Sequence, residues 1–407
     1  MKIEAPRGTH DVLPDEWPHW QRIVREAERL CGLYGYRPVT TPVFEETELF
    51  RRTSGAGSDV VQKEMYTFAD RSERSLTLRP EGTAPIARAY LEHGLHREPQ
   101  PVKLYTIASM YRYAAPQRGR FREHWQLSVE ALGSDDPALD AELIQLYDEL
   151  LRALAVADYT LLLNSIGDAR CRPAYLERLD AWLDEHEGEL DEEARTKRAT
   201  SPLRVFDVKS ERVRRALAAA PKIGESLCAE CADHFAAVRV YLDAYGLAYE
   251  LEPTLVRGLD YYTRTTWEFV GPELGAQSSL SGGGRYDGLV EEIGGPPTPG
   301  VGFGAGIERL HIAVGAEADD EPGIDVFFAA EDDAPRAEVL ALMAELRRGG
   351  RSCETDYAGR SLKGQLTQAG RLGARTVVIA AAGGVTVRRR GAEDVHVGSL
   401  AEAREFL

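Results

Sequence analysis

The segment AEADDEPG at residues 316–323 constrains the fold more than any other feature, because the pattern of the chain changes there. Beyond it, apolar runs such as IDVFFAA and RTVVIAA alternate with helix-like segments such as PRAEVLALMAELRRGG. Alternating strands and helices over the last 86 residues are typical of a small, separate α/β domain. A chain of 407 residues is also too long for one ordinary core. We therefore predict two domains, at residues 1–320 and 322–407.

The first part of the chain mixes strands and helices without that regular alternation. Apolar residues at helical spacing predict helices over 15–37 and 138–154. The segments PVKLYTIASMYRY, HWQLSVEALG and DYTLLLNSIG are typical of strands, and we expect residues 251–270, which include LVRGLDYYTRTTWEFV, to be extended as well. Residues 170–248 are charged and rich in Leu and Ala, so we expect a helical module inserted into this domain, at about 170–248.

Composition limits the location of the protein and its partners. The chain has no stretch of 18 apolar residues, so we expect no membrane partner. Its polar, acidic start lacks the apolar region of a secretory signal, and five cysteines make no disulfide framework, so we expect a cytoplasmic protein. The net charge of −17 taken alone argues against a nucleic-acid partner. Residues 322–407 nevertheless carry twelve basic and twelve acidic side chains, so this neutral part could present a local basic surface to RNA.

Polar residues alternate along the strand-like segment HWQLSVEALG. Gln126, Ser128 and Glu130 share one face, because successive side chains of a strand point to opposite faces. Three polar groups on one face of a core-like strand indicate a lined pocket, although a solvated face of an ordinary sheet gives the same pattern.

The segment TLRPEGTAPIARA places Glu81 and Thr83 where a strand turns into a helix. A carboxylate at such a turn can hold the ammonium group of a ligand. It can equally cap the free N–H groups of the helix and interact with its dipole.

Arginines recur near strand ends and loops. They are Arg112, Arg120, Arg122, Arg257 and Arg309. A buried guanidinium needs an anion, and the oxygens of a triphosphate match its forked geometry. Salt bridges within an acidic protein are the other interpretation of each of these arginines.

Other sequence patterns carry less information. GVGFGAGIERL has glycines ahead of a helix but no accompanying βαβ unit, and no Gly-Lys-Ser/Thr phosphate loop occurs in the chain. Cys228, Cys231 and His234 offer three possible metal ligands, but a second pair is missing. We therefore expect thiols without a metal there.

Taken in order, these segments resemble the histidyl-tRNA synthetase family of class II aminoacyl-tRNA synthetases over essentially the whole chain. PRGTHDVLP resembles the family's N-terminal segment, and YGYRPVTTPVFEETELF resembles motif 1, with Pro42 at the dimer-forming position. MYRYAAPQRGRFREHWQLSVE and GVGFGAGIERL resemble motifs 2 and 3. LVRGLDYYTRTTWEFV and SGGGRYDGLVEEIGG resemble the two histidine-specific motifs.

The resemblance implies an α+β fold. It consists of a class II catalytic domain with an antiparallel sheet and a helical insertion, followed by a small C-terminal α/β anticodon-binding domain. It also implies a homodimer formed through motif 1, with L-histidine, ATP, Mg²⁺ and tRNA(His) as substrates and partners.

Roles follow from the resemblance position by position. Arg257 and Arg112 are expected to contact the α-phosphate in catalysis, with Gly258 allowing the backbone to approach closely. The ATP-binding residues would be Arg112, Arg120 and Arg309. The histidine-binding residues would be Glu81, Thr83, Gln126, Glu130, Tyr261 and Tyr262, with Glu130 and Tyr262 contacting the imidazole.

One departure from the family pattern leaves an alternative open. Motif 2 usually continues after its arginine with an acid and often a second arginine, where this chain has Ala114 and Ala115. Catalytically inactive relatives bind histidine as regulatory subunits of ATP phosphoribosyltransferase. They typically lose the arginine of LVRGLDYY and the C-terminal domain, both of which this chain keeps.

Overall fold

A computed structural model describes residues 2–55, 58, 60–208, 210–271, 278–315, 323–331, 334–389 and 391–407. The chain forms two compact units, Met1–Glu317 and Ala318–Leu407. The break falls within the segment 316–323, of which residues 316–322 lie outside the described residues.

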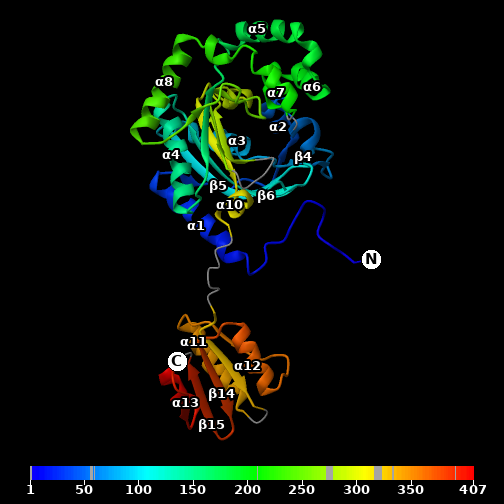
Figure 1. Cartoon of the computed structure of the whole chain (residues 1–407). Coiled ribbons are helices and arrows are strands. Elements are labelled where there is room, and N and C mark those ends of the chain that lie inside the picture. Colours follow the sequence, from blue (N-terminus) through cyan, green and yellow to red (C-terminus); the bar gives the residue numbers. More distant parts are fainter. Residues whose placement is uncertain are drawn as a thin grey trace. The chain divides into compact units, whose positions relative to one another are not determined.

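An eight-stranded sheet is the centre of the first unit (Figure 1). Its strand order is β1-β5-β6-β11-β10-β9-β7-β8, and all internal neighbours from β5 to β7 are antiparallel. The short edge strands β1 and β8 pair in parallel with β5 and β7. The strands are β1 (Arg37–Pro38), β5 (Val102–Tyr111), β6 (Glu123–Leu132), β7 (Thr160–Ser165), β8 (Glu250–Leu251), β9 (Thr263–Val270), β10 (Ser279–Arg285) and β11 (Gly300–Gly306).

Helices cover one face of this sheet and form the main core with it. They are α1 (Trp17–Leu33), α4 (Pro137–Ala153), α8 (Ala229–Ala244) and α10 (Ile307–Val314). Leu127, Val129 and Ala131 of β6 point into this core with Trp267 and Phe269 of β9. The polar residues between them in β6 therefore face the opposite side, as the alternation in HWQLSVEALG predicts.

On that opposite side lie α3 (Thr83–Glu92) and α9 (Leu289–Glu292). A three-stranded antiparallel sheet in the order β2-β4-β3 leads into α3. It consists of β2 (Phe44–Glu46), β3 (Thr67–Ala69) and β4 (Ser75–Leu78), with α2 (Thr47–Ser54) after β2 and the π-helical turn Val60–Glu64 before β3.

The helical insertion is smaller than residues 170–248. The helices α5 (Arg172–Glu185), α6 (Glu192–Thr200) and α7 (Glu211–Leu217) share a core of their own around Tyr175 and Leu179. By contrast, Val238 and Leu242 of α8 belong to the main core, and α8 lies beside α4 (Figure 1). The composition of α8 resembles that of its neighbours, which hides this difference from the sequence.

The expectation of a continuous strand over 251–270 is wrong. Between β8 and β9, residues 252–262 form turns and irregular backbone, although they include Leu255, Tyr261 and Tyr262. These three side chains are buried all the same, at 6–7% exposure. The bulky residues of this segment are buried by packing, without pairing in the sheet.

The second unit is a five-stranded sheet in the order β13-β12-β14-β15-β16 with three α-helices. The strands β13, β12 and β14 are parallel, and β15 and β16 continue antiparallel. Its elements are β12 (Val326–Ala330), α11 (Arg336–Arg348), β13 (Cys353–Thr355), α12 (Leu362–Arg371), β14 (Thr376–Ala381), β15 (Gly384–Arg389), β16 (Val395–Val397) and α13 (Leu400–Ala403).

Among the helices that the structure describes, each is too short or too polar to cross a bilayer.

Candidate active site

Glycines of the central sheet lie directly against polar side chains of β6. Residues of β6 lie next to Gly302 and Gly304 of β11, which in turn pair with β10. A Cβ at Gly302 would lie 1.8 Å from Glu130 Oε2, and one at Gly304 would lie 2.8 Å from Gln126 Nε2. The glycines of GVGFGAG therefore leave room for the polar side chains of β6 rather than for a dinucleotide.

The carboxyl group of Glu130 lies beside these glycines. Glu130 is fully buried, which excludes a solvated face of the sheet at this position. Thr83 Oγ1 donates to Glu130 Oε1 at 2.7 Å, and the Tyr286 hydroxyl donates to Oε2. Burial raises the pKa of Glu130 to about 8, although both hydrogen bonds act in the opposite direction. Tyr286 was not among the predicted site residues, although it lies within the motif SGGGRYDG.

Glu81 lies two residues before α3 and binds the N–H groups of its first turn, as one of the two interpretations of TLRPEG predicts. Its carboxylate accepts from the backbone N–H groups of Thr83 at 2.6 Å and Ala84 at 2.9 Å. The side chain is nonetheless 2% exposed, and burial raises its pKa. Each carboxylate oxygen has further lone pairs, so capping of α3 leaves Glu81 able to accept from a ligand ammonium group.

Three buried tyrosines lie close to one another, and one of them, Tyr286, is hydrogen-bonded to Glu130. The rings of Tyr261 and Tyr262 lie 4.6 Å apart, and those of Tyr261 and Tyr286 lie 5.8 Å apart. All three belong to the same buried cluster as Ile86 of α3. Their rings are apolar surfaces, and the hydroxyl group at the end of each ring is a hydrogen-bond donor.

Arg257 lies against Gly282 of β10 and Glu268 of β9. Its Nη1 is 3.2 Å from Glu268 Oε1, and a Cβ at Gly282 would meet its guanidinium at 1.9 Å. By contrast, a Cβ at Gly258 would meet nothing within 4 Å. No group of the described chain therefore packs closely against Gly258. The glycine that makes room for the Arg257 side chain is Gly282.

Three other arginines lie near His124. Burial, together with the charges of Arg112, Arg309 and Arg120, lowers the pKa of His124 to about 3. Burial lowers the pKa of Arg309, and the charges of Arg112, Arg120 and Arg257 lower it further. Three guanidinium groups therefore lie within electrostatic range of Arg309, an arrangement suited to a polyanion.

The hydrogen bonds of these arginines differ. Arg112 Nε donates to Pro80 O at 2.7 Å, and Arg309 donates to the carbonyl oxygens of Gly119 and Ser279. Arg120 forms an ion pair with Glu64 at 2.6 Å, as the structural interpretation of these arginines predicts. Arg122 stacks on the ring of Tyr113 at 3.8 Å and donates to Ala114 O.

The two alanines of motif 2 lie between these groups. Ala114 is 3% exposed, whereas Ala115 is exposed. At these two positions the motif 2 loop thus has one buried and one exposed methyl group, in place of the acid and the arginine that are common in the family.

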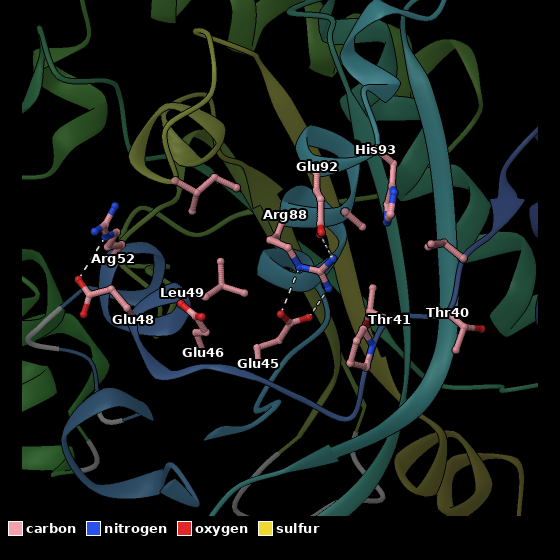
Figure 2. Close-up of a pocket in the computed structure, with 14 residues that line it drawn as sticks. Thr40, Thr41, Glu45, Glu46, Glu48, Leu49, Arg52, Arg88, Glu92 and His93 are labelled. Atoms are coloured by element: carbon pink, nitrogen blue, oxygen red, sulfur yellow. Dashed lines mark hydrogen bonds and ion pairs between the residues drawn. The ribbon is translucent and has the colours of Figure 1, made fainter. Parts of the chain in front are cut away.

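A pocket of about 710 Å³ lies between the segment 39–52 and α3 (Figure 2), and its lining residues include none of Arg112, Arg120, Arg257 and Arg309. Figure 2 shows Arg88 between Glu45 and Glu92, with Arg52 bonded to Glu48. This pocket is lined by the segment that resembles motif 1.

Taken together, the first unit combines a largely antiparallel sheet, glycines that lie against buried carboxyl and tyrosine groups, and a group of four arginines. This is the architecture of a class II aminoacyl-tRNA synthetase.

Comparisons with known proteins agree. The model of the histidyl-tRNA synthetase family matches residues 8–310. A histidine–tRNA ligase of Desulforudis audaxviator (strain MP104C) is 47% identical over 414 residues, covering 100% of this chain and 99% of the relative. One of Moorella thermoacetica (strain ATCC 39073 / JCM 9320) is 47% identical over 397 residues, covering 96% and 94%. The apo S. aureus histidyl-tRNA synthetase superposes with a TM-score of 0.82 at 34% identity, covering 100% and 99%. The chain belongs to the histidyl-tRNA synthetase family.

A further solved structure bears on the alternative. An ATP phosphoribosyltransferase regulatory subunit/histidyl-tRNA synthetase from Bacillus halodurans C gives a TM-score of 0.65 at 23% identity, covering 93% of this chain and 98% of that one. At that identity the match shows a shared fold alone. The histidine–tRNA ligases, at 46–47% identity, favour the ligase over the regulatory subunit.

Proposed function

We propose that this protein ligates L-histidine to tRNA(His) through histidyl-adenylate, with ATP entering as its Mg²⁺ complex. The single observation that carries the proposal is the buried Glu130 carboxyl group, hydrogen-bonded by Thr83 and Tyr286 and, like Arg257, close enough to Tyr262 to influence its pKa. Five free cysteines agree with a reducing, cytoplasmic setting.

Histidine would bind with its side chain at the closed end of the pocket. A neutral imidazole has one donor and one acceptor nitrogen. Glu130 would accept from the N–H group, and a hydroxyl such as that of Tyr262 would donate to the other nitrogen. Glu81 and Thr83 would hold the substrate ammonium group, and Gln126 would lie beside the amino acid, with Tyr261 as a wall.

The arginines would stabilise the first chemical step. A histidine carboxylate oxygen attacks the α-phosphorus of ATP, and pyrophosphate leaves. Both reactants are anionic, and Arg257 and Arg112 would contact the α-phosphate, while Arg309 and Arg120 would hold the ATP phosphates. One charge pair at about 4 Å with an effective dielectric constant near 20 contributes roughly 4 kcal/mol. If this interaction energy is gained mainly in the transition state, it raises the rate about a thousandfold.

The second unit would bind the anticodon arm of tRNA(His). Its own cores support an independent fold, and residues 322–407, with twelve basic and twelve acidic side chains, carry none of the net negative charge of the chain. Phosphate contacts of such a surface would make charging sensitive to salt.

The protein would act as a homodimer formed through motif 1. Val43, Phe44 and Phe68 are 41–48% exposed on the small sheet, and the rings of Phe44 and Phe68 lie 6.1 Å apart. Exposed apolar residues in a group are typical of an interface. Phe44→Glu should shift the protein towards a monomer in sedimentation analysis, whereas Leu340→Glu, an exposed residue of the second unit, should not. A Phe44→Glu protein that remains a dimer would move the interface elsewhere.

Charging of tRNA tests the proposed function. Purified protein with ATP, Mg²⁺ and labelled histidine should attach histidine to a tRNA(His) transcript, and not to a tRNA for another amino acid. A protein that binds histidine and charges neither tRNA would instead be a regulatory subunit.

A further inference from the structure

Four possible metal ligands meet at the base of the helical insertion. Asp168, Cys171, Cys228 and Cys231 each place one ligand atom so that all four lie within 4.8 Å of one another. The sequence suggested His234 as the partner of the two later cysteines. In the structure His234 instead faces Asp140, at 3.7 Å, and Asp168 and Cys171 complete the set.

The two halves of this cluster come from the two ends of the insertion. Asp168 follows β7, and Cys171 directly precedes α5, where the insertion begins. Cys228 directly precedes α8, and Cys231 lies in the first turn of α8, where the chain returns to the main core. The sequence thus contains two ligand pairs, Asp-x-x-Cys and Cys-x-x-Cys, that are far apart in the chain. Their ligand atoms lie close together in the structure.

Backbone groups already orient the ligands. The N–H of Cys228 lies 3.0 Å from Cys171 Sγ, and the N–H groups of Arg170 and Cys171 donate to Asp168 Oδ1 at 2.9 and 3.3 Å. Cys171 and Cys231 are buried, and Asp168 and Cys228 are partly buried. Hydrogen bonds to ligand atoms from a surrounding shell are a regular feature of metal sites in proteins.

Nearby cations would offset the charge of such a site. Three thiolates and one carboxylate around a divalent ion leave a net charge of about −2. Arg170 Nη2 is 2.9 Å from Asp168 Oδ2, and Arg264 Nη2 is 4.0 Å from the same oxygen. Both guanidinium groups lie on the Asp168 side of the cluster.

We propose that Asp168, Cys171, Cys228 and Cys231 bind one structural Zn²⁺ ion. Tetrahedral Zn²⁺ with Zn–S distances of about 2.3 Å holds its sulfur ligands about 3.8 Å apart, so the observed spacing needs only a small closure. Three thiolates with one carboxylate oxygen suit Zn²⁺, whereas iron–sulfur clusters are usually held by four thiolates and Ca²⁺ or Mg²⁺ by oxygen ligands. Four protein ligands leave no open position, so the ion is structural and takes no part in adenylate formation.

The ion ties the insertion to the wall of the histidine pocket. Arg172, the residue after Cys171, donates to the Tyr262 carbonyl oxygen. Gly167, the residue before Asp168, accepts from the Arg264 N–H at 2.7 Å. The metal therefore cross-links the start of α5, the start of α8 and, through these bonds, the segment that carries Tyr262.

Metal analysis of the full-length, tag-free protein tests the proposal. Protein purified without chelators should contain about one zinc per chain by mass spectrometry. Protein exchanged into Co²⁺ should show thiolate-to-cobalt charge-transfer absorption and the visible bands of tetrahedral Co²⁺. Cys228→Ser/Cys231→Ser should lose the zinc, whereas Cys31→Ala and Cys353→Ala, which change buried cysteines outside the cluster, should retain it.

The variant Asp168→Cys distinguishes an effect on metal coordination from an effect on folding. A fourth thiolate should keep the zinc and shift the cobalt spectrum, while Asp168→Ala should weaken binding at least about tenfold. A chelator should lower the melting temperature of the wild-type protein, which needs no mutation to fold. Wild-type protein that contains no zinc and gives no thiolate–cobalt absorption overturns the proposal, as does zinc that stays in the double-serine variant.

Discussion

Replacing Glu130 by Gln should change how the stability of the protein depends on pH. Burial raises the pKa of this carboxyl group from its ordinary value of 4.5 to about 8, and the group is fully buried. The folded state therefore keeps a proton that the unfolded chain releases between these values. The free energy of unfolding falls as pH rises through this window, by up to about 5 kcal/mol in total and about 2 kcal/mol between pH 6 and pH 8.

Glutamine has nearly the same volume and carries no charge, so Glu130→Gln removes this contribution. The variant should melt close to the wild-type temperature near pH 5 and above it by pH 8, by an amount on the order of 2–4 °C. The measurement is the difference in melting temperature between variant and wild type at each pH, without substrates, so that buffer effects cancel. Glu28→Gln, an exposed change on α1, is the matched control and should show no such trend.

A constant difference from pH 5 to pH 8.5 would show that Glu130 is already ionised in the empty pocket and would refute this reasoning. The same variant should raise the KM for histidine far more than the KM for ATP, because Glu130 is proposed to contact the imidazole alone.

Further predictions concern the neighbours of Glu130 and the two units. Tyr286→Phe removes a hydrogen bond to the buried carboxyl group, so it should raise the pKa of Glu130 further and raise the KM for histidine, measured by pyrophosphate exchange, by roughly tenfold; an unchanged KM and pH profile would contradict this. Arg257→Ala should slow exchange by about a thousandfold with the fold intact by circular dichroism, and Arg257→Lys should also be slow because an ammonium group lacks the fork; near wild-type exchange in either would remove Arg257 from catalysis. Residues 1–317 alone should still activate histidine but charge tRNA roughly tenfold more slowly or worse; equal charging by the two forms would exclude anticodon binding by the second unit.

Local patterns predicted those parts of the fold that depend on short-range physics. The alternation of Gln126, Ser128 and Glu130 with Leu127 and Val129 predicts which face of β6 enters the core, and the structure has this arrangement. The change of pattern at 316–323 likewise falls at the division between the units. In both cases the signal lies within one segment of the chain.

Features that depend on distant segments were missed. Tyr286 bonds Glu130 across 156 positions of sequence, and Cys171 meets Cys228 across 57. The segment 255–262 is rich in strand formers, but its burial against α3 and the tyrosine cluster overrides that propensity. A pattern within one segment does not report which distant side chain completes a site.

The measurement that tests the central claim most directly is histidine-dependent exchange of labelled pyrophosphate into ATP by the full-length protein. The proposed pocket predicts rapid exchange with histidine and rejection of an apolar amino acid of similar size by roughly 10⁴, because that ligand would leave buried polar groups unpaired. If histidine binds in calorimetry but supports no exchange at saturating ATP and Mg²⁺, the pocket recognises histidine without activating it, and the protein is not a ligase.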